Sequence, residues 1–325
     1  MSGVPGRVTV LDLEPVNADF LAEVLAGLSA SPRSLPCKFF YDERGADLFQ
    51  KICELPEYYI TRTETELLRR YGSEMADSIG ANVELIGFGT GAGIKTRMLL
   101  EHLENPIAYV PVDISKQRLI DSAIELSHAM PSLEILPVCG DYLQELQLPK
   151  PLRKPDHVAV YFPGSTIGNL ERDMALDFLR RVCRLCGKSG GLIIGVDLQK
   201  SRDVLEAAYN DSAGVTAEFN LNLLVRANRE LGADFDLPLW RHQAIYNEQH
   251  GRIEMHLVSV AEQTVHVGRR EFAFARGEKI VTEYSYKHTV EGFARLASLA
   301  GFREASRVWT DPERLFAVFH FAVAE

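Results

Sequence analysis

Short apolar runs alternate with amphipathic stretches from residue 83 onward. Runs of five or six residues predict buried strands at Val83–Phe88, Ala108–Val112, Leu133–Val138, Val158–Phe162 and Gly191–Val196. Apolar residues at helical spacing predict helices at Ile94–Leu103, Lys116–Ala129 and Met174–Leu185. Such an alternation is typical of an α/β fold, with a parallel sheet covered by helices on both sides.

The pattern changes after Leu198. One or two helices are predicted within 203–231, followed by alternating antiparallel strands at Ile253–Val260, Gln263–Val267, Glu271–Ala275 and Lys279–Tyr286. The C-terminal segment returns to the first style, with a helix at Thr289–Ala300 and strands at Glu304–Trp309 and Leu315–Val323. We therefore expect one domain from residues 63–198 and 288–325, and a second α+β lobe from residues 1–62 and 199–287.

Composition excludes several classes of protein. The chain has 325 residues, 46% of them hydrophobic, and 35 basic against 45 acidic residues give a formal charge of −10. This sign disfavours nucleic acid as a partner. Apolar stretches fall short of the roughly 20 residues that span a bilayer, and Met1–Leu13 lacks the pattern of a secretory signal, so we expect a cytoplasmic protein. The odd number of scattered cysteines, five, predicts reduced thiols.

Polar and glycine-rich segments follow three successive predicted strands. The first strand runs into the glycine-rich segment 87–93, and Asp113 follows Gly91 by 22 residues. Asp141 and Tyr142 follow the third strand. Glycines at a strand-to-helix turn allow close approach to the backbone, and an acid at the next strand end can accept both hydrogens of a ribose diol. The pattern predicts a nucleoside-bearing cofactor.

Other interpretations of these residues remain open. Asp113 and Asp141 also suit helix caps, and the segment 87–92 fits the loose dinucleotide pattern of a nicotinamide-dependent oxidoreductase. Against the oxidoreductase, the C-terminal order of one helix and two strands suits the seven-stranded, Rossmann-like sheet of a class I methyltransferase. A binder of the same fold without activity is a third alternative.

A set of short motifs, in order from about residue 31 onward, carries a resemblance to a known family. The motifs are Ser34-Leu35-Pro36, Phe40-Tyr41-Asp42, Leu55-Pro56-Glu57-Tyr58-Tyr59, Lys95-Thr96-Arg97, Gly164-Ser165-Thr166-Ile167-Gly168-Asn169 and Gly214-Val215-Thr216-Ala217. The chain resembles the histidine Nα-methyltransferases of ergothioneine biosynthesis. This resemblance implies transfer of three methyl groups from S-adenosylmethionine to the α-amine of L-histidine, which gives hercynine. A methyltransferase for another amino acid or amine is the alternative.

The resemblance also implies the roles of individual residues. Those expected to hold S-adenosylmethionine are Tyr41, Gly89, Lys95, Asp113, Asp141 and Tyr142. Those expected to contact histidine are Tyr58, Gly164, Asn169, Tyr209, Met255, Glu283 and Ser285. Among these, Tyr58 would face the imidazole, Glu283 and Ser285 would bind its two nitrogens, and Asn169 and Tyr209 would hold the carboxylate. The resemblance implies a monomer without a metal, and it identifies no general base.

The residue types also fit this substrate on chemical grounds. An ionised Glu283 accepts a hydrogen bond and the Ser285 hydroxyl can donate one, and residues two apart on a strand share a face. Such a pair suits a ring that donates at one nitrogen and accepts at the other. Alone, the pair would more often mark the solvent face of a strand, and Asn169 could equally cap the following helix.

Two further features carry expectations. Gly87 stands where the family has an acid near the methionine end of the cofactor, so we expect weaker cofactor binding unless Glu84, three residues earlier, or a water substitutes. Cys183 and Cys186 lie about one turn apart on a predicted helix, where small side chains facing the core are the expectation and a zinc site is not.

Overall fold

The computed structural model describes residues 9–13, 20–89, 93–303 and 307–324, and the chain divides into two compact units. Unit 1 comprises Met1–Pro15, Thr63–Leu198 and His288–Glu325, and unit 2 comprises Val16–Arg62 and Gln199–Lys287. The expected placement of the whole segment 1–62 in the second lobe is wrong at its start. Residues 11–12 form a strand that pairs with residues 138–139 in the sheet of unit 1.

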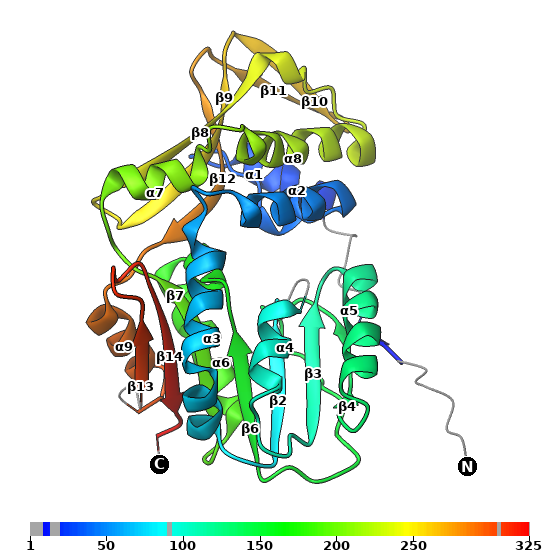
Figure 1. Cartoon of the computed structure of the whole chain (residues 1–325). Coiled ribbons are helices and arrows are strands. Elements are labelled where there is room, and N and C mark those ends of the chain that lie inside the picture. Colours follow the sequence, from blue (N-terminus) through cyan, green and yellow to red (C-terminus); the bar gives the residue numbers. More distant parts are fainter. Residues whose placement is uncertain (1–8, 14–19, 90–92, 304–306, 325) are drawn as a thin grey trace. The chain divides into compact units, whose positions relative to one another are not determined.

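Unit 1 is built on one nine-stranded sheet with the order β1-β5-β3-β2-β6-β7-β14-β13, in which β4 also pairs with β3 (Figure 1). Its strands are β1 (Leu11–Asp12), β2 (Val83–Phe88), β3 (Ala108–Asp113), β4 (Glu134–Ile135), β5 (Val138–Cys139), β6 (His157–Phe162), β7 (Gly191–Asp197), β13 (Arg307–Thr310) and β14 (Phe316–Ala322). All pairings are parallel except those of β14, which is antiparallel to β7 and β13. This is the class I methyltransferase arrangement.

The sheet has more strands than the seven predicted, for two reasons. Strand β1 adds an edge, and the run predicted as one strand at Leu133–Val138 divides into β4 and β5. Leu136 still donates its N–H to Tyr109, but Pro137 has no N–H to offer the ladder, so regular pairing stops there. Residue 304, where a strand was expected to start, and Gly91 lie outside the described residues.

Helices cover both faces of this sheet because its strands are apolar on both sides. The helices of unit 1 are the main part of α3 (Tyr59–Ile79), α4 (Ile94–Leu100), α5 (Lys116–Ala129), α6 (Arg172–Cys186) and α9 (Val290–Leu299). Phe178 of α6 and Phe293 of α9 pack with alternate residues of β7, Ile194 and Val196, in one buried core. Gly195, between them, faces the other side, where the side chain of Glu64 from α3 lies against it. Cys186 belongs to the core, as expected of a small apolar side chain.

Unit 2 combines helices with two small antiparallel sheets. The helices are α1 (Phe20–Ser29), α2 (Glu43–Glu54), α7 (Arg202–Tyr209) and α8 (Val215–Leu231), with short 3₁₀ segments η2 (Cys37–Phe40) and η4 (Leu237–Leu239). The sheets have the orders β12-β9-β8 and β10-β11. Their strands are β8 (Trp240–Asn247), β9 (Arg252–Ser259), β10 (Gln263–Val267), β11 (Arg270–Phe274) and β12 (Lys279–Tyr286). Strand β8 was not predicted, because its alternation is weak and polar residues recur along it.

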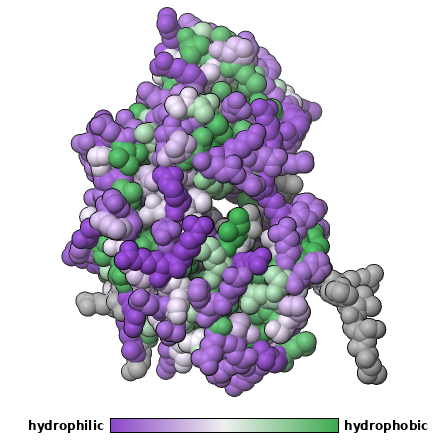
Figure 2. Space-filling model, in the orientation of Figure 1, coloured by the Kyte–Doolittle hydropathy of each residue, from purple (hydrophilic) through white to green (hydrophobic). Residues whose placement is uncertain are grey.

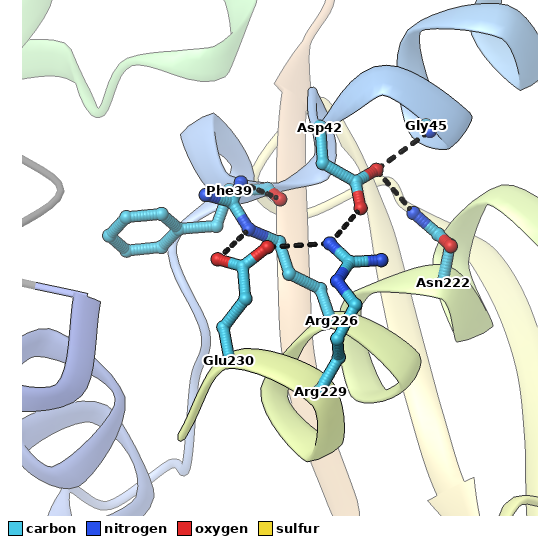
Figure 3. Close-up of polar contacts among 7 residues, drawn as sticks. All are labelled: Phe39, Asp42, Gly45, Asn222, Arg226, Arg229 and Glu230. Carbon is cyan, nitrogen blue, oxygen red and sulfur yellow. Dashed lines mark hydrogen bonds and ion pairs between the residues drawn. The ribbon is translucent and has the colours of Figure 1, made fainter. Parts of the chain in front are cut away.

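The carboxylate of Asp42 joins the start of α2 to α8 (Figure 3). Its Oδ1 accepts hydrogen bonds from the Gly45 N–H and the Asn222 side chain, both at 2.8 Å. Its Oδ2 accepts a hydrogen bond from Arg229 at 2.7 Å. Burial alone would raise the pKa of Asp42, but these donors outweigh burial and hold the pKa below its usual value. The position of the preceding residue, Tyr41, is therefore fixed within unit 2.

A second contact of α8 holds the same segment. The Arg226 guanidinium donates to the backbone carbonyl of Phe39 at 2.9 Å and to Glu230 at 2.9 Å (Figure 3). The Arg226 side chain is buried against the rings of Phe20 and Phe39. These contacts join η2, which lies just before Asp42 in the sequence, to α8.

The described residues contain no helix long and apolar enough to cross a bilayer. On the face drawn in Figure 2, hydrophilic residues predominate and apolar residues form scattered groups.

Asp42→Ala is expected to lower the free energy of unfolding by about 2–3 kcal/mol at pH 7, because it removes a helix cap and leaves buried donors unpaired. Urea denaturation measures this loss. Since the pKa of Asp42 is lowered, its contribution is present above the ordinary value of 3.8 and is lost as the pH falls through the lowered pKa. Asp236→Ala is the control, because Asp236 is exposed and precedes η4 without capping it; an equal loss in both variants would contradict the prediction.

Candidate functional site

The turn after β2 requires a glycine at residue 89. Gly89 has φ +58°, which residues with a side chain rarely adopt, and a Cβ there would lie 3.5 Å from the Tyr142 ring. Its N–H donates to the Val112 carbonyl at 3.0 Å, which fixes the turn against the end of β3. The following residues 90–92 lie outside the described part of the chain. Gly89 thus begins the turn at the carboxyl end of the central strand, where open α/β sheets bind ligands.

Asp113 and Asp141 end neighbouring strands at this edge. Asp113 is the last residue of β3 and its Oδ1 accepts the Ser115 N–H at 2.9 Å. Asp141 follows β5 by two residues and its Oδ1 accepts the Leu143 N–H at 2.8 Å. Each carboxylate is therefore oriented by its own backbone. Neither bond caps a helix, because the N-cap residue of α5 is Ser115 and turns rather than a helix follow Asp141, so the capping interpretation is wrong for both residues.

Tyr142 lies in an aromatic group at the same edge. Its ring stacks on Phe88 with a centroid separation of 5.8 Å and meets Phe162 and Phe178 edge-on at 5.4 and 6.1 Å. These contacts hold the ring firmly next to Gly89. A purine ring prefers such a flat apolar surface. The turn, the two acids and this ring suit S-adenosylmethionine.

A buried ion pair lies beside these residues. Glu64, near the start of α3, is fully buried and forms a very short contact with the Lys95 ammonium of α4. Its carboxylate also accepts the Gly164 N–H, at 2.9 and 3.1 Å from its two oxygens. Gly195 makes room for it, since a Cβ at that residue would lie 2.1 Å from Glu64 Oε1. Glu64 therefore fixes both Lys95 and the loop after β6, and its role was not predicted from the sequence.

The expectation that Glu84 could replace an acid at Gly87 is wrong. Glu84 is the second residue of β2 and the turn follows the sixth, about 13 Å further along the strand at 3.3 Å per residue. Glu84 instead lies near Glu134, and burial together with the charge of Glu134 raises the pKa of Glu84. In unit 1, Glu64 supplies a carboxylate next to Lys95.

Asn169 and Gly164 lie in the loop after β6. Gly164 has φ +78° and Ser165 has φ +57°, which together turn the chain into a short 3₁₀ segment, η3 (Thr166–Asn169). Helix α6 begins after Glu171, so Asn169 is not its N-cap residue. The capping interpretation of Asn169 therefore loses its support.

A bulge in β12 shapes the predicted imidazole site in unit 2. Val281 pairs with His256 of β9, and Glu283 pairs with the next residue, Met255, so Thr282 is extra. The bulge resets the alternation, and Glu283, Ser285 and Lys287 then share one face. Ser285 and Lys287 are each 3% exposed. The alternative of a solvent-facing strand is therefore wrong at Ser285.

Three polar groups meet on this face. The Tyr209 hydroxyl, at the end of α7, lies 2.9 Å from Ser285 Oγ. Lys287 Nζ donates to both, at 2.9 Å to Tyr209 and 2.8 Å to Ser285. The ring of Tyr58 packs edge-on against the Tyr209 ring at 6.3 Å. Five of the seven residues expected to contact histidine thus lie in unit 2. They are Tyr58, Tyr209, Met255, Glu283 and Ser285.

The electrostatics of Glu283 follow from its surroundings. Burial raises its pKa to about 7, and the positive charge of Lys287 works in the opposite direction. Glu283 therefore changes charge near neutral pH. Such a shifted carboxyl group marks a candidate functional site when it also has a defined geometry.

The expected residues divide between the units. Gly89, Lys95, Asp113, Asp141, Tyr142, Gly164 and Asn169 lie in unit 1, whereas Tyr41, Tyr58, Tyr209, Met255, Glu283 and Ser285 lie in unit 2. Lys287 was missed, although it continues the spacing of two set by Glu283 and Ser285. Glu64 has no such signal, because its partners are distant in sequence.

Comparisons with known proteins agree with this geometry. A family described as histidine-specific, S-adenosylmethionine-dependent methyltransferases matches residues 20–323. The chain is 40% identical over 306 residues to a histidine N-alpha-methyltransferase of Mycolicibacterium smegmatis, covering 91% of this chain and 94% of that protein. It is 38% identical over 314 residues to one of Mycobacterium tuberculosis, covering 94% and 96%. The ergothioneine biosynthesis protein 1 of Neurospora crassa is 32% identical over 291 residues, which are 86% of this chain and 32% of that protein.

The predicted family is thereby confirmed. The order of the sheet also speaks against the alternative of a nicotinamide-dependent oxidoreductase, since β14 runs antiparallel between β7 and β13. The chain belongs to the histidine-specific, S-adenosylmethionine-dependent methyltransferases.

Proposed function

We propose that this protein transfers three methyl groups from S-adenosylmethionine to the α-amine of L-histidine, giving hercynine for ergothioneine biosynthesis. Family membership supports the cofactor and the substrate class. The observation that carries the proposal is that Glu283 and Ser285 share one face of β12 and that Tyr209 contacts Ser285, because this group combines a carboxylate acceptor with hydroxyl groups that can donate. The substrate is a small molecule.

The cofactor half of the proposal rests on unit 1. Asp113 would accept hydrogen bonds from the ribose, Asp141 and the Tyr142 ring would hold the adenine, and Lys95 would bind the carboxylate of the methionine end. Glu64 keeps the Lys95 ammonium in place. Its negative charge would also suit the α-ammonium group at the methionine end of the cofactor. Bound S-adenosylmethionine supplies a methyl group on a positively charged sulfur, which is a good leaving group.

The protein's contribution to the reaction is mainly positional. Alignment of the attacking nitrogen with the methyl group, in a site from which water is excluded, can supply most of the acceleration. Tyr58 and Met255 provide buried apolar surface at the ring, and Asn169 and Tyr209 would hold the carboxylate. Gly164 leaves space next to Lys95, which three successive methylations need. We assign no described side chain as general base, and the proton of the amine passes to solvent.

Mass spectrometry of wild-type protein incubated with histidine and S-adenosylmethionine tests the proposal directly. Products heavier than histidine by one, two and three methyl groups are expected. Methylation of other amino acids in preference to histidine would overturn the substrate assignment.

Asp113→Ala is expected to weaken S-adenosylmethionine binding by about 10- to 100-fold, because a charged acceptor contributes about 1.5–3 kcal/mol. Histidine binding should change much less. Calorimetry with each ligand measures the two affinities. Asp121→Ala, an exposed residue of α5, is the matched control, and unchanged cofactor affinity in Asp113→Ala would remove this residue from the site.

Glu64→Gln is expected to weaken S-adenosylmethionine binding about tenfold or more while the fold is retained. The amide keeps an acceptor for the Gly164 N–H but no longer holds the Lys95 ammonium. Fluorescence titration with cofactor measures the change. Glu66→Gln, exposed on the same helix, serves as control, and equal affinities for both variants would contradict the role of Glu64.

Glu283→Ala is expected to raise the KM for histidine at least tenfold and to leave cofactor affinity intact, because the ring N–H loses its acceptor. In the wild type, kcat/KM should fall as the pH drops through about 7, since protonated Glu283 loses the negative charge that strengthens that bond. Steady-state kinetics between pH 5.5 and 9, a range that brackets about 7, measures both effects. Glu271→Ala, exposed on β11, is the control; equal loss of both ligands in Glu283→Ala would count against the assignment.

A further inference from the structure

We propose that Lys287 is a positioning residue that makes Ser285 a hydrogen-bond donor, so that the site selects the neutral form of the imidazole ring. The inference rests on the proposed function and deepens it, because it concerns the protonation state in which histidine is bound.

Lys287 donates both of the hydrogen bonds that its ammonium group makes to Tyr209 and Ser285. An ammonium group can only donate, so both the Tyr209 and the Ser285 oxygen act as acceptors toward Nζ. Lys287 is 3% exposed, so water does not replace these contacts. One acceptor position on each hydroxyl oxygen is therefore occupied before any substrate arrives.

The hydrogen bond between the Tyr209 and Ser285 hydroxyl groups uses one of their two hydrogens. At 2.9 Å, one of the two hydrogens lies between Tyr209 and Ser285, and the other points elsewhere. If Tyr209 donates, Ser285 accepts twice and its remaining capacity is its own hydrogen. Ser285 then offers a donor from the face of β12 that also carries Glu283.

This arrangement matches one form of the ring. An ionised Glu283 accepts the N–H of one ring nitrogen, and Ser285 donates to the lone pair of the other. A neutral imidazole has one N–H and one lone pair. An imidazolium ion has two N–H groups, and one of them would point its hydrogen at the hydrogen of Ser285. The Lys287 charge also opposes a second cation on the same face.

The ionisable groups that surround Glu283 come from several segments. Cys37 of η2 and Tyr58 before α3 interact with its charge, and burial raises the pKa of the Cys37 thiol to about 12 and that of Tyr58 well above its usual value. Both groups are therefore neutral at pH 7. Lys287 is the cation whose charge lowers the pKa of Glu283.

The first test is Lys287→Met, which keeps an unbranched side chain one atom shorter and removes its charge. The KM for histidine should rise about 10- to 100-fold, as expected for loss of a charge-assisted contact. The acid limb of kcat/KM should also move to higher pH, because Glu283 loses the group that lowers its pKa. A purely structural defect would lower kcat/KM without moving this limb.

The matched control is Lys200→Met. Lys200 Nζ donates to the Tyr59 hydroxyl at 2.7 Å and lies 4.4 Å from that ring, so the substitution removes another lysine–tyrosine contact of unit 2. The acid limb should stay in place. The proposal is overturned if Lys287→Met leaves both the acid limb and the KM where they are in the wild type, or if both variants move the limb equally.

The second test uses wild-type protein and does not depend on how Lys287→Met folds. Histidine and 1,2,4-triazole-3-alanine, whose ring stays neutral at pH 6, are titrated in the presence of S-adenosylhomocysteine in buffers of different ionisation enthalpy. With an ordinary imidazole pKa near 6.5, histidine should release about 0.8 of a proton more than the triazole analogue. An equal release by the two ligands would mean that the ring binds protonated, which overturns the proposal.

Failure of the underlying function gives a different result. A wild-type protein that binds histidine with the expected proton release but forms no methylated product would refute methyl transfer and leave the role of Lys287 standing. Methylated product with no excess proton release would support methyl transfer and refute the role of Lys287.

Discussion

A charge that leaves water must meet a partner within the protein, and both candidate sites are organised around this constraint. In unit 1 the fully buried Glu64 meets Lys95 and a backbone N–H. In unit 2 the buried Lys287 meets two hydroxyl groups next to Glu283. Each cluster joins elements that are distant in sequence, so the side chains proposed to bind ligand are fixed by the same contacts that complete the fold.

Much of the fold could be predicted because its signals are local. The predicted bounds of β2, α5, β10 and β12 coincide with those in the structure, since the strands are apolar or alternating runs and α5 carries apolar residues at helical spacing. The predictions failed where long-range pairing decides. Strand β1 has two residues and exists through its partner β5, and Pro137 divides a run whose hydrophobicity alone suggests one strand.

The site was predictable to the extent that motifs carry it. Glu283 and Ser285 were assigned through the family resemblance, with which their residue types and spacing agree, and the ends of β3 and β5 pointed to Asp113 and Asp141. Lys287 required knowledge that Tyr209, 78 residues earlier, lies against it. Glu64 required knowledge that Gly195 leaves space for it, which depends on the packing of α3 over β7. The bulge at Thr282 has no signature in the sequence, although it decides toward which side of the sheet Glu283, Ser285 and Lys287 point.

The assembly of unit 2 from two separate stretches of chain has a consequence for biosynthesis. Asp42 and its partner Asn222 are 180 residues apart, and Phe39 and Arg226 are 187 apart. On the ribosome, the apolar surface around Phe20, Phe39 and Phe40 therefore waits for α8 to emerge, while most of the central strands of unit 1 are already made. Contacts over such long loops form slowly. The N-terminal stretch is thus the part of the nascent chain with the longest exposure to aggregation and to chaperones.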